Sequence, residues 1–154
     1  MAEVKGPAFD LEAANRYFAA HCFNRAWDLI EKQVRTPEDD RLMVALNQAS
    51  IYHWLQRSDC GNKQLSIGFW QASRIQSVLG NAIEARRQAE VCLSYSCELE
   101  PFYLAYAHEA LARAARVAGD LKLAHFHRAE ATKLAGDIAK KDDRDLLLKD
   151  LESI

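Results

Sequence analysis

Residues 101–120 read PFYLAYAHEALARAARVAGD, and this stretch is the strongest indication of fold class in the 154-residue chain. It begins with Pro101, ends with Gly119-Asp120 and carries seven alanines between them, a pattern that favours a helix. The alanines lie around nearly the whole circumference of that helix, so neighbouring helices can approach it closely on several sides. The stretch predicts an interior helix of an all-α domain.

Two further helix patterns refine this expectation. Within 101–120 the polar residues Glu109, Arg113 and Arg116 are spaced i, i+4, i+7, which predicts one solvated stripe with a favourable Glu–Arg pair. The predicted helix at 38–57 has two apolar stripes, which predict neighbours on two sides. These stripes are Leu42/Ala45/Leu46/Ala49/Tyr52 and Val44/Ile51/Leu55.

Capping and breaking signals divide the chain into about eight helices. Asp10 and Thr36-Pro37 are typical helix starts, and Gly80-Asn81 and Gly119-Asp120 combine a helix-ending glycine with a capping residue. The predicted helices span about 10–22, 24–35, 38–57, 62–79, 81–98, 101–118, 120–139 and 142–154. Because the intervening turns are short, sequential helices are expected to be antiparallel.

Composition narrows the classes of function. The chain is 49% hydrophobic and 27% charged with a formal net charge of −2, which fits a single domain over 1–154 and gives no reason to expect nucleic acid as a partner. No stretch approaches the ~20 apolar residues of a membrane span, so we expect no membrane partner. The four cysteines form no CxxC pair, which predicts reduced, mostly buried thiols and a cytoplasmic location.

An internal repeat connects the two glycine turns. When Gly80 is aligned with Gly119, Ala85 falls on Ala124 and Cys92 falls on Ala131. A glycine turn, a small residue five positions later and another seven after that resembles the tetratricopeptide helix-turn-helix unit. The resemblance implies antiparallel helix pairs stacked as a short right-handed array, with 142–154 as a capping helix. A closed helical bundle is the alternative.

Stacked helix pairs leave a concave face suited to an extended peptide or a partner helix. The stretches 52–60 and 70–74 are dense in aromatic and polar residues, which are typical binding anchors. The same residues could instead be core fillers and a local ion pair between Arg57 and Asp59. The predicted protein- or peptide-binding residues are His53, Trp54, Arg57, Trp70 and Arg74, with Tyr103 and Tyr106 as a second tier.

The competing interpretation is a helical bundle that binds a small molecule in a pocket and could act on it as an enzyme. Such a pocket would use His53, Asp59 and Cys60, residue types of a Cys–His nucleophile system, or Tyr106 and His108. We favour the non-enzymatic interpretation, with no catalytic residue, metal or cofactor assigned, because the histidines are scattered and no phosphate-binding loop or nucleophile motif occurs. A third interpretation is a homodimer whose binding face is its own subunit interface.

Overall fold

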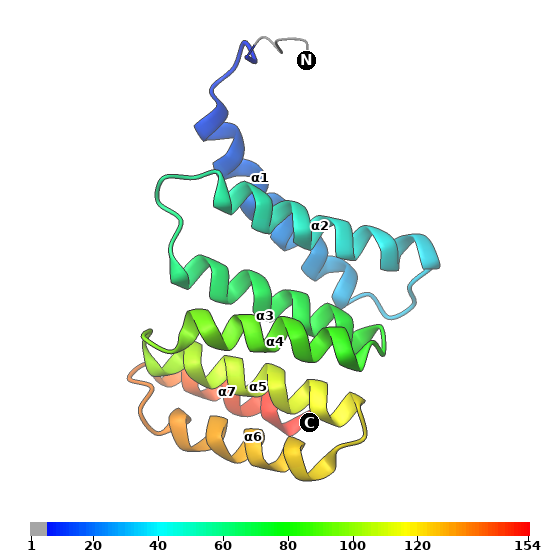
Figure 1. Ribbon diagram of the computed structural model, residues 1–154, viewed down its shortest axis with the longest axis vertical. Helices are drawn as coiled ribbons and strands as arrows, with labels where there is room; N and C mark the ends of the chain where they lie inside the picture. Colours follow the sequence, from blue (N-terminus) through cyan, green and yellow to red (C-terminus); the bar gives the residue numbers. More distant parts are fainter. Residues whose placement is uncertain (1–5) are drawn as a thin grey trace.

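The computed structural model describes residues 6–154, and every regular element in that range is an α-helix. The helices are α1 (Leu11–Ile30), α2 (Pro37–Leu55), α3 (Asn62–Val78), α4 (Ala82–Ser96), α5 (Pro101–Val117), α6 (Leu121–Ala135) and α7 (Lys141–Glu152). Figure 1 shows them stacked along the long axis of the molecule, with α1 and α2 at one end and α6 and α7 at the other.

The stack is built from three helix pairs, α1 with α2, α3 with α4 and α5 with α6. Helix α3 also packs on α2 and α5, and α7 packs on α5 and α6. Within residues 6–154, α1 and α2 contact no helix beyond α3, so the two ends of the stack do not meet (Figure 1). The architecture is therefore an open all-α array, and the closed-bundle alternative is wrong.

The break predicted near residue 23 does not exist. Helix α1 runs without interruption from Leu11 to Ile30 and replaces the two helices expected at 10–22 and 24–35. Ala19, Cys22 and Ala26 are buried at i, i+3, i+7 spacing, so one apolar face continues across the expected break. Asn24 lies exposed on the opposite side, where an asparagine costs a helix little.

Thr36, Gly80 and Gly119 act as predicted, whereas Asn81 precedes α4 without forming a side-chain capping hydrogen bond. Thr36 forms a capping box, in which its hydroxyl accepts from the backbone N–H of Asp39 and the Asp39 carboxylate accepts from the backbone N–H of Thr36. Gly80 and Gly119 end α3 and α5 with φ of 77° and 78°, a left-handed conformation that favours glycine.

The buried face of α2 differs from the prediction. Met43, Asn47, Ser50 and Ile51 are its buried residues, whereas Leu42, Tyr52 and Leu55 of the predicted stripes are exposed. Two of the buried residues are polar because they bond to neighbouring helices. The Asn47 amide donates to the carbonyl of Gly68 in α3, and the Ser50 hydroxyl donates to the carbonyl of Ala19 in α1.

Small residues set the spacing between helices through the rest of the array. Ala85, Cys92, Ala124 and Ala131, the positions that the repeat alignment superimposes, are all buried. Ala89 of α4 is also fully buried, beside Ala110 and Leu111 of α5, with Trp70 packed against them. The close approach of α4 to α5 therefore depends on the methyl side chains of Ala89 and Ala110 at this contact.

Enlarging one of these alanines should separate the helices. We expect Ala89→Leu to lower the free energy of unfolding by about 2 kcal/mol, since the site has no room for the added carbons. Urea denaturation measures this loss. Ala129→Leu, the same change at an exposed helical position of α6, is the control and should shift stability by less than about 0.5 kcal/mol. Equal effects of the two substitutions would refute the packing argument.

Candidate functional site

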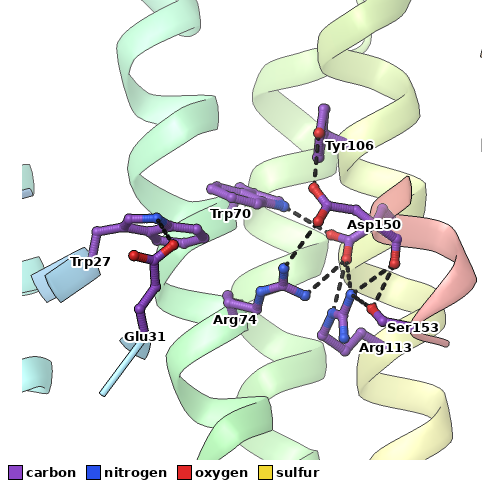
Figure 2. Close-up of polar contacts among 9 residues, drawn as sticks. Trp27, Glu31, Trp70, Arg74, Tyr106, Arg113, Asp150 and Ser153 are labelled. Carbon is purple, nitrogen blue, oxygen red and sulfur yellow. Dashed lines mark hydrogen bonds and ion pairs between the residues drawn. The ribbon is translucent and has the colours of Figure 1, made fainter. Parts of the chain in front are cut away.

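A connected group of aromatic and charged side chains joins α1, α3, α5 and α7 (Figure 2). Trp27 of α1 stacks on Trp70 of α3 with ring centroids 5.4 Å apart. Trp70 meets Tyr106 of α5 edge to face, again at 5.4 Å, and Tyr106 in turn meets Phe102 at 4.9 Å. Trp27 and Trp70 are half-buried, so parts of both rings reach solvent. We call Trp27, Trp70, Tyr106 and Phe102 the aromatic ladder.

Glu109 lies at the centre of this group and is only 1% exposed. Its carboxylate accepts from Trp70 Nε1 at 2.9 Å, from Arg74 Nη1 at 3.3 Å and from Arg113 Nε at 2.8 Å. The pairing with Arg113 is confirmed, but the solvated stripe is wrong at Glu109. A buried carboxylate is stable only when it is paired and hydrogen-bonded, and here two guanidinium groups and an indole from two helices do this.

Asp150 of α7 extends the network to the C-terminal helix. It accepts from the Tyr106 hydroxyl at 2.9 Å and lies 3.5 Å from Arg74 Nη2. Arg113 Nη2 donates to the backbone carbonyl of Asp150 and to the Ser153 hydroxyl. Burial, together with the adjacent Asp150 carboxylate, raises the pKa of Tyr106, so this hydroxyl stays protonated as a donor. The two arginines and two carboxylates balance in charge.

The predicted binding residues divide between two places. Trp70, Arg74 and Tyr106 belong to the network, whereas His53, Trp54 and Arg57 lie at the end of α2 and in the turn after it. Tyr103 contacts Phe102 of the ladder edge to face at 5.2 Å and lies beside Lys63, whose ammonium is 5.2 Å from the ring centroid. Among residues 6–154, no hydrogen bond or ion pair joins the α2 group to the network.

The residues at the end of α2 serve mainly to fix a turn. Arg57 is buried, lies over the Trp54 ring at 3.9 Å and donates to both oxygens of Asp59 at 2.8 and 2.7 Å. These hydrogen bonds lower the pKa of Asp59 to about 2. His53 bonds through Nδ1 to the Asn15 side chain at 2.8 Å. The Arg57–Asp59 ion pair that the sequence suggested is therefore present.

The residues of the competing enzyme interpretation are not assembled for nucleophilic catalysis. His53 bonds to Asn15 and Asp59 to Arg57, and burial raises the pKa of Cys60 rather than lowering it. His108 does not meet Tyr106 in a hydrogen bond but pairs with His127, with the two Nδ1 atoms 3.0 Å apart. The pKa of each of these histidines is lowered, mainly by burial.

A cavity of about 350 Å³ lies elsewhere, between α4, α5 and α6. Its lining is mostly apolar and includes Leu93, Leu111, Ala114 and Leu123, with His127 at its border. It contains none of the predicted binding residues. Over residues 6–154, no cluster of three His, Cys, Asp or Glu side chains is placed to hold a metal ion. In the same range no helix is both long and apolar enough to cross a bilayer.

The chain matches no protein-family model, and comparisons with curated proteins and with solved structures gave no significant match. The tetratricopeptide resemblance therefore stays a prediction.

Sequence reasoning missed Trp27, Glu109 and Asp150. A signal for Glu109 exists in helical spacing, because Glu109–Arg113 is an i, i+4 pair on a helix that packs against the Trp70–Arg74 pair, whereas Trp27 gives no such signal. Asp150 gives no such signal, since its partners lie 44 and 76 residues away along the chain, in α5 and α3.

Removing the central charge should destabilise the whole array. We expect Glu109→Gln to lower the free energy of unfolding by about 3 kcal/mol, because it leaves the partly buried Arg113 without a carboxylate and Arg74 with Asp150 alone. Chemical denaturation measures the change. Glu90→Gln breaks the exposed Arg86–Glu90 pair and is the control, with an expected loss below about 1 kcal/mol. A small loss for Glu109→Gln would contradict the role assigned to it.

The cysteines should differ sharply in reactivity. Burial raises the pKa of Cys92 to about 11, whereas Cys97 is exposed. Because the thiolate is the reactive form, iodoacetamide at neutral pH should label Cys97 in the native protein and Cys92 only after unfolding. Peptide mass spectrometry measures both. Native labelling of Cys92 at the rate of Cys97 would show that α3 and α4 open far more readily than this packing implies.

Proposed function

We propose that the protein is a non-enzymatic binding module that holds an extended peptide segment of a partner protein along the aromatic ladder. The observation that carries this proposal is the Trp27–Trp70 stack, in which two partly buried indole rings lie side by side on neighbouring helix pairs. Tryptophan and arginine are the residue types that contribute most to binding at interfaces.

The hydrogen bonds of the ladder support recognition through ring faces. Both indole N–H groups are already used, Trp27 Nε1 donating to Glu31 and Trp70 Nε1 to Glu109. Each ring is therefore held in one orientation, and its free surface is apolar. A rigid aromatic surface binds with little loss of side-chain entropy.

The charges beside the ladder limit the kind of segment it can accept. Arg74 is held by Glu109 and Asp150, so it is not a free cation that would attract a strongly acidic partner. We infer that the bound peptide segment places apolar or aromatic side chains on the ladder. Its backbone would form hydrogen bonds beside the ladder. The His53, Trp54 and Arg57 group would form a second contact only for a partner that also reaches the end of α2.

We also propose a tetratricopeptide-like classification and a cytoplasmic location. The buried small residues at the aligned repeat positions support the first. The second is supported by Cys92, which packs as a thiol against Ser66 and Ser96 in a site that fits the reduced form.

Selection from a phage-displayed library of random peptides tests the proposal. Peptides selected on the wild-type protein should bind Trp27→Leu at least about tenfold more weakly, because a stacked aromatic anchor is lost. Trp54→Leu is the matched control and should retain affinity within about threefold. Circular dichroism verifies that each variant is folded.

Two results would overturn the proposal. One is a selection that enriches no peptide above background. The other is a set of enriched peptides that bind Trp27→Leu as tightly as the wild-type protein.

A further inference from the structure

The two ends of the array are covered differently. At the C-terminal end, α7 buries Leu147 and Leu151 against α5 and α6. The exposed residues of α7 are mostly polar, with Lys141, Asp142, Asp145, Lys149 and Glu152 beside Leu146 and Leu148. Helical arrays need such a polar outer helix to stay soluble.

At the other end, no helix formed by residues 6–154 lies beyond α1 and α2 on the side away from α3 (Figure 1). The side chains there are apolar and exposed: Phe18 is 43%, Leu42 44%, Leu11 54% and Tyr52 58% accessible. Ala45 and Ala49 lie between Leu42 and Tyr52 on the same stripe of α2. We call this surface the terminal face, formed by Leu11, Phe18, Leu42, Ala45, Ala49 and Tyr52.

The aromatic part of the terminal face is continuous. Phe18 stacks on His53 at 5.3 Å, and His53 meets Tyr52 at 5.4 Å. Tyr17, which is 59% exposed, contacts Phe18 at 5.2 Å and stacks on His21 at 5.1 Å. These five rings form one contiguous patch across α1 and α2. Isolated apolar residues on a surface would not form such a patch.

We propose that the terminal face is a homodimer interface, in which a second copy of this chain covers the uncapped end of the array. The face has two unlike halves. Large rings project where the start of α1 meets the end of α2, and the flat surface of Ala45 and Ala49 lies further toward the start of α2. A two-fold axis between the halves places the rings of each copy over the alanines of the other, which is the self-complementarity that a two-fold interface requires.

The area available agrees with a dimer. Large side chains about half exposed contribute roughly 100 Å² each, so Leu11, Phe18, Leu42 and Tyr52 of the terminal face, with the adjoining Tyr17, offer roughly 500 Å² per copy. With the partly exposed histidines and alanines between them, each copy offers between the roughly 600 Å² per partner of a weak interface and the about 800 Å² of a standard one. Because a two-fold interface uses the same face of both copies, the association closes at two copies and does not continue into a filament.

Sedimentation equilibrium of the full chain tests the proposal. At micromolar concentration the wild-type protein should have twice the 17.4 kDa mass of one chain. Ala49→Arg places a bulky charge in the flat half of the interface and should weaken dimerisation at least about tenfold. Tyr52→Ser removes a projecting ring and should also weaken dimerisation. Ala129→Arg, at an exposed position of α6, is the control and should remain dimeric.

Circular dichroism and thermal melting of each variant distinguish a loss of dimerisation from a loss of folding. If Ala49→Arg is misfolded, the oligomeric state of Tyr52→Ser tests the interface. Folded, monomeric variants beside a dimeric control support the interface. A wild-type protein that is monomeric throughout the micromolar range overturns it, and so does a folded Tyr52→Ser variant that dimerises as tightly as the wild type. Peptide selection on the aromatic ladder is unaffected by either result.

Discussion

The carboxylate of Glu109, which is almost fully buried, is bound by side chains of α3 and α5. Removing the charge of Glu109 from water costs several kcal/mol, and only the arrangement of Trp70, Arg74 and Arg113 around it offsets that cost. Because those donors come from α3 and α5, the carboxylate fixes how two successive helix pairs are placed. Asp150 adds α7 through Arg74 and Tyr106, and the Trp27–Trp70 stack adds α1.

The same constraint shapes the proposed binding surface. Arg74 lies between two carboxylates, and Trp70 is held by its indole N–H, so neither side chain is free to change orientation. The aromatic ladder is therefore a product of the packed array and not of any single helix. Residues far apart in sequence, such as Trp27 and Asp150, contribute to one surface because the helix pairs stack in register (Figure 2).

How far the sequence predicts this structure depends on the range of the interaction. Thr36 and Gly119 act through their immediate neighbours, and the helix boundaries they predict are correct. The helix boundary predicted at Asn24 is wrong, because the continuous buried face of Ala19, Cys22 and Ala26 outweighs the local preference of asparagine. Local patterns also misplaced Glu109, since its burial depends on Trp70 and Arg74, which lie 39 and 35 residues earlier in the chain.

Hydrogen exchange of the Glu109→Gln variant, followed by mass spectrometry, tests most directly whether this carboxylate joins the helices. If it does, amide exchange should accelerate in α3, α5 and α7 together, while the α1–α2 pair changes least because it contacts only α3. Faster exchange confined to α5, with α3 and α7 as protected as in the wild-type protein, would contradict the account, because the network would then stabilise a single helix and not the array.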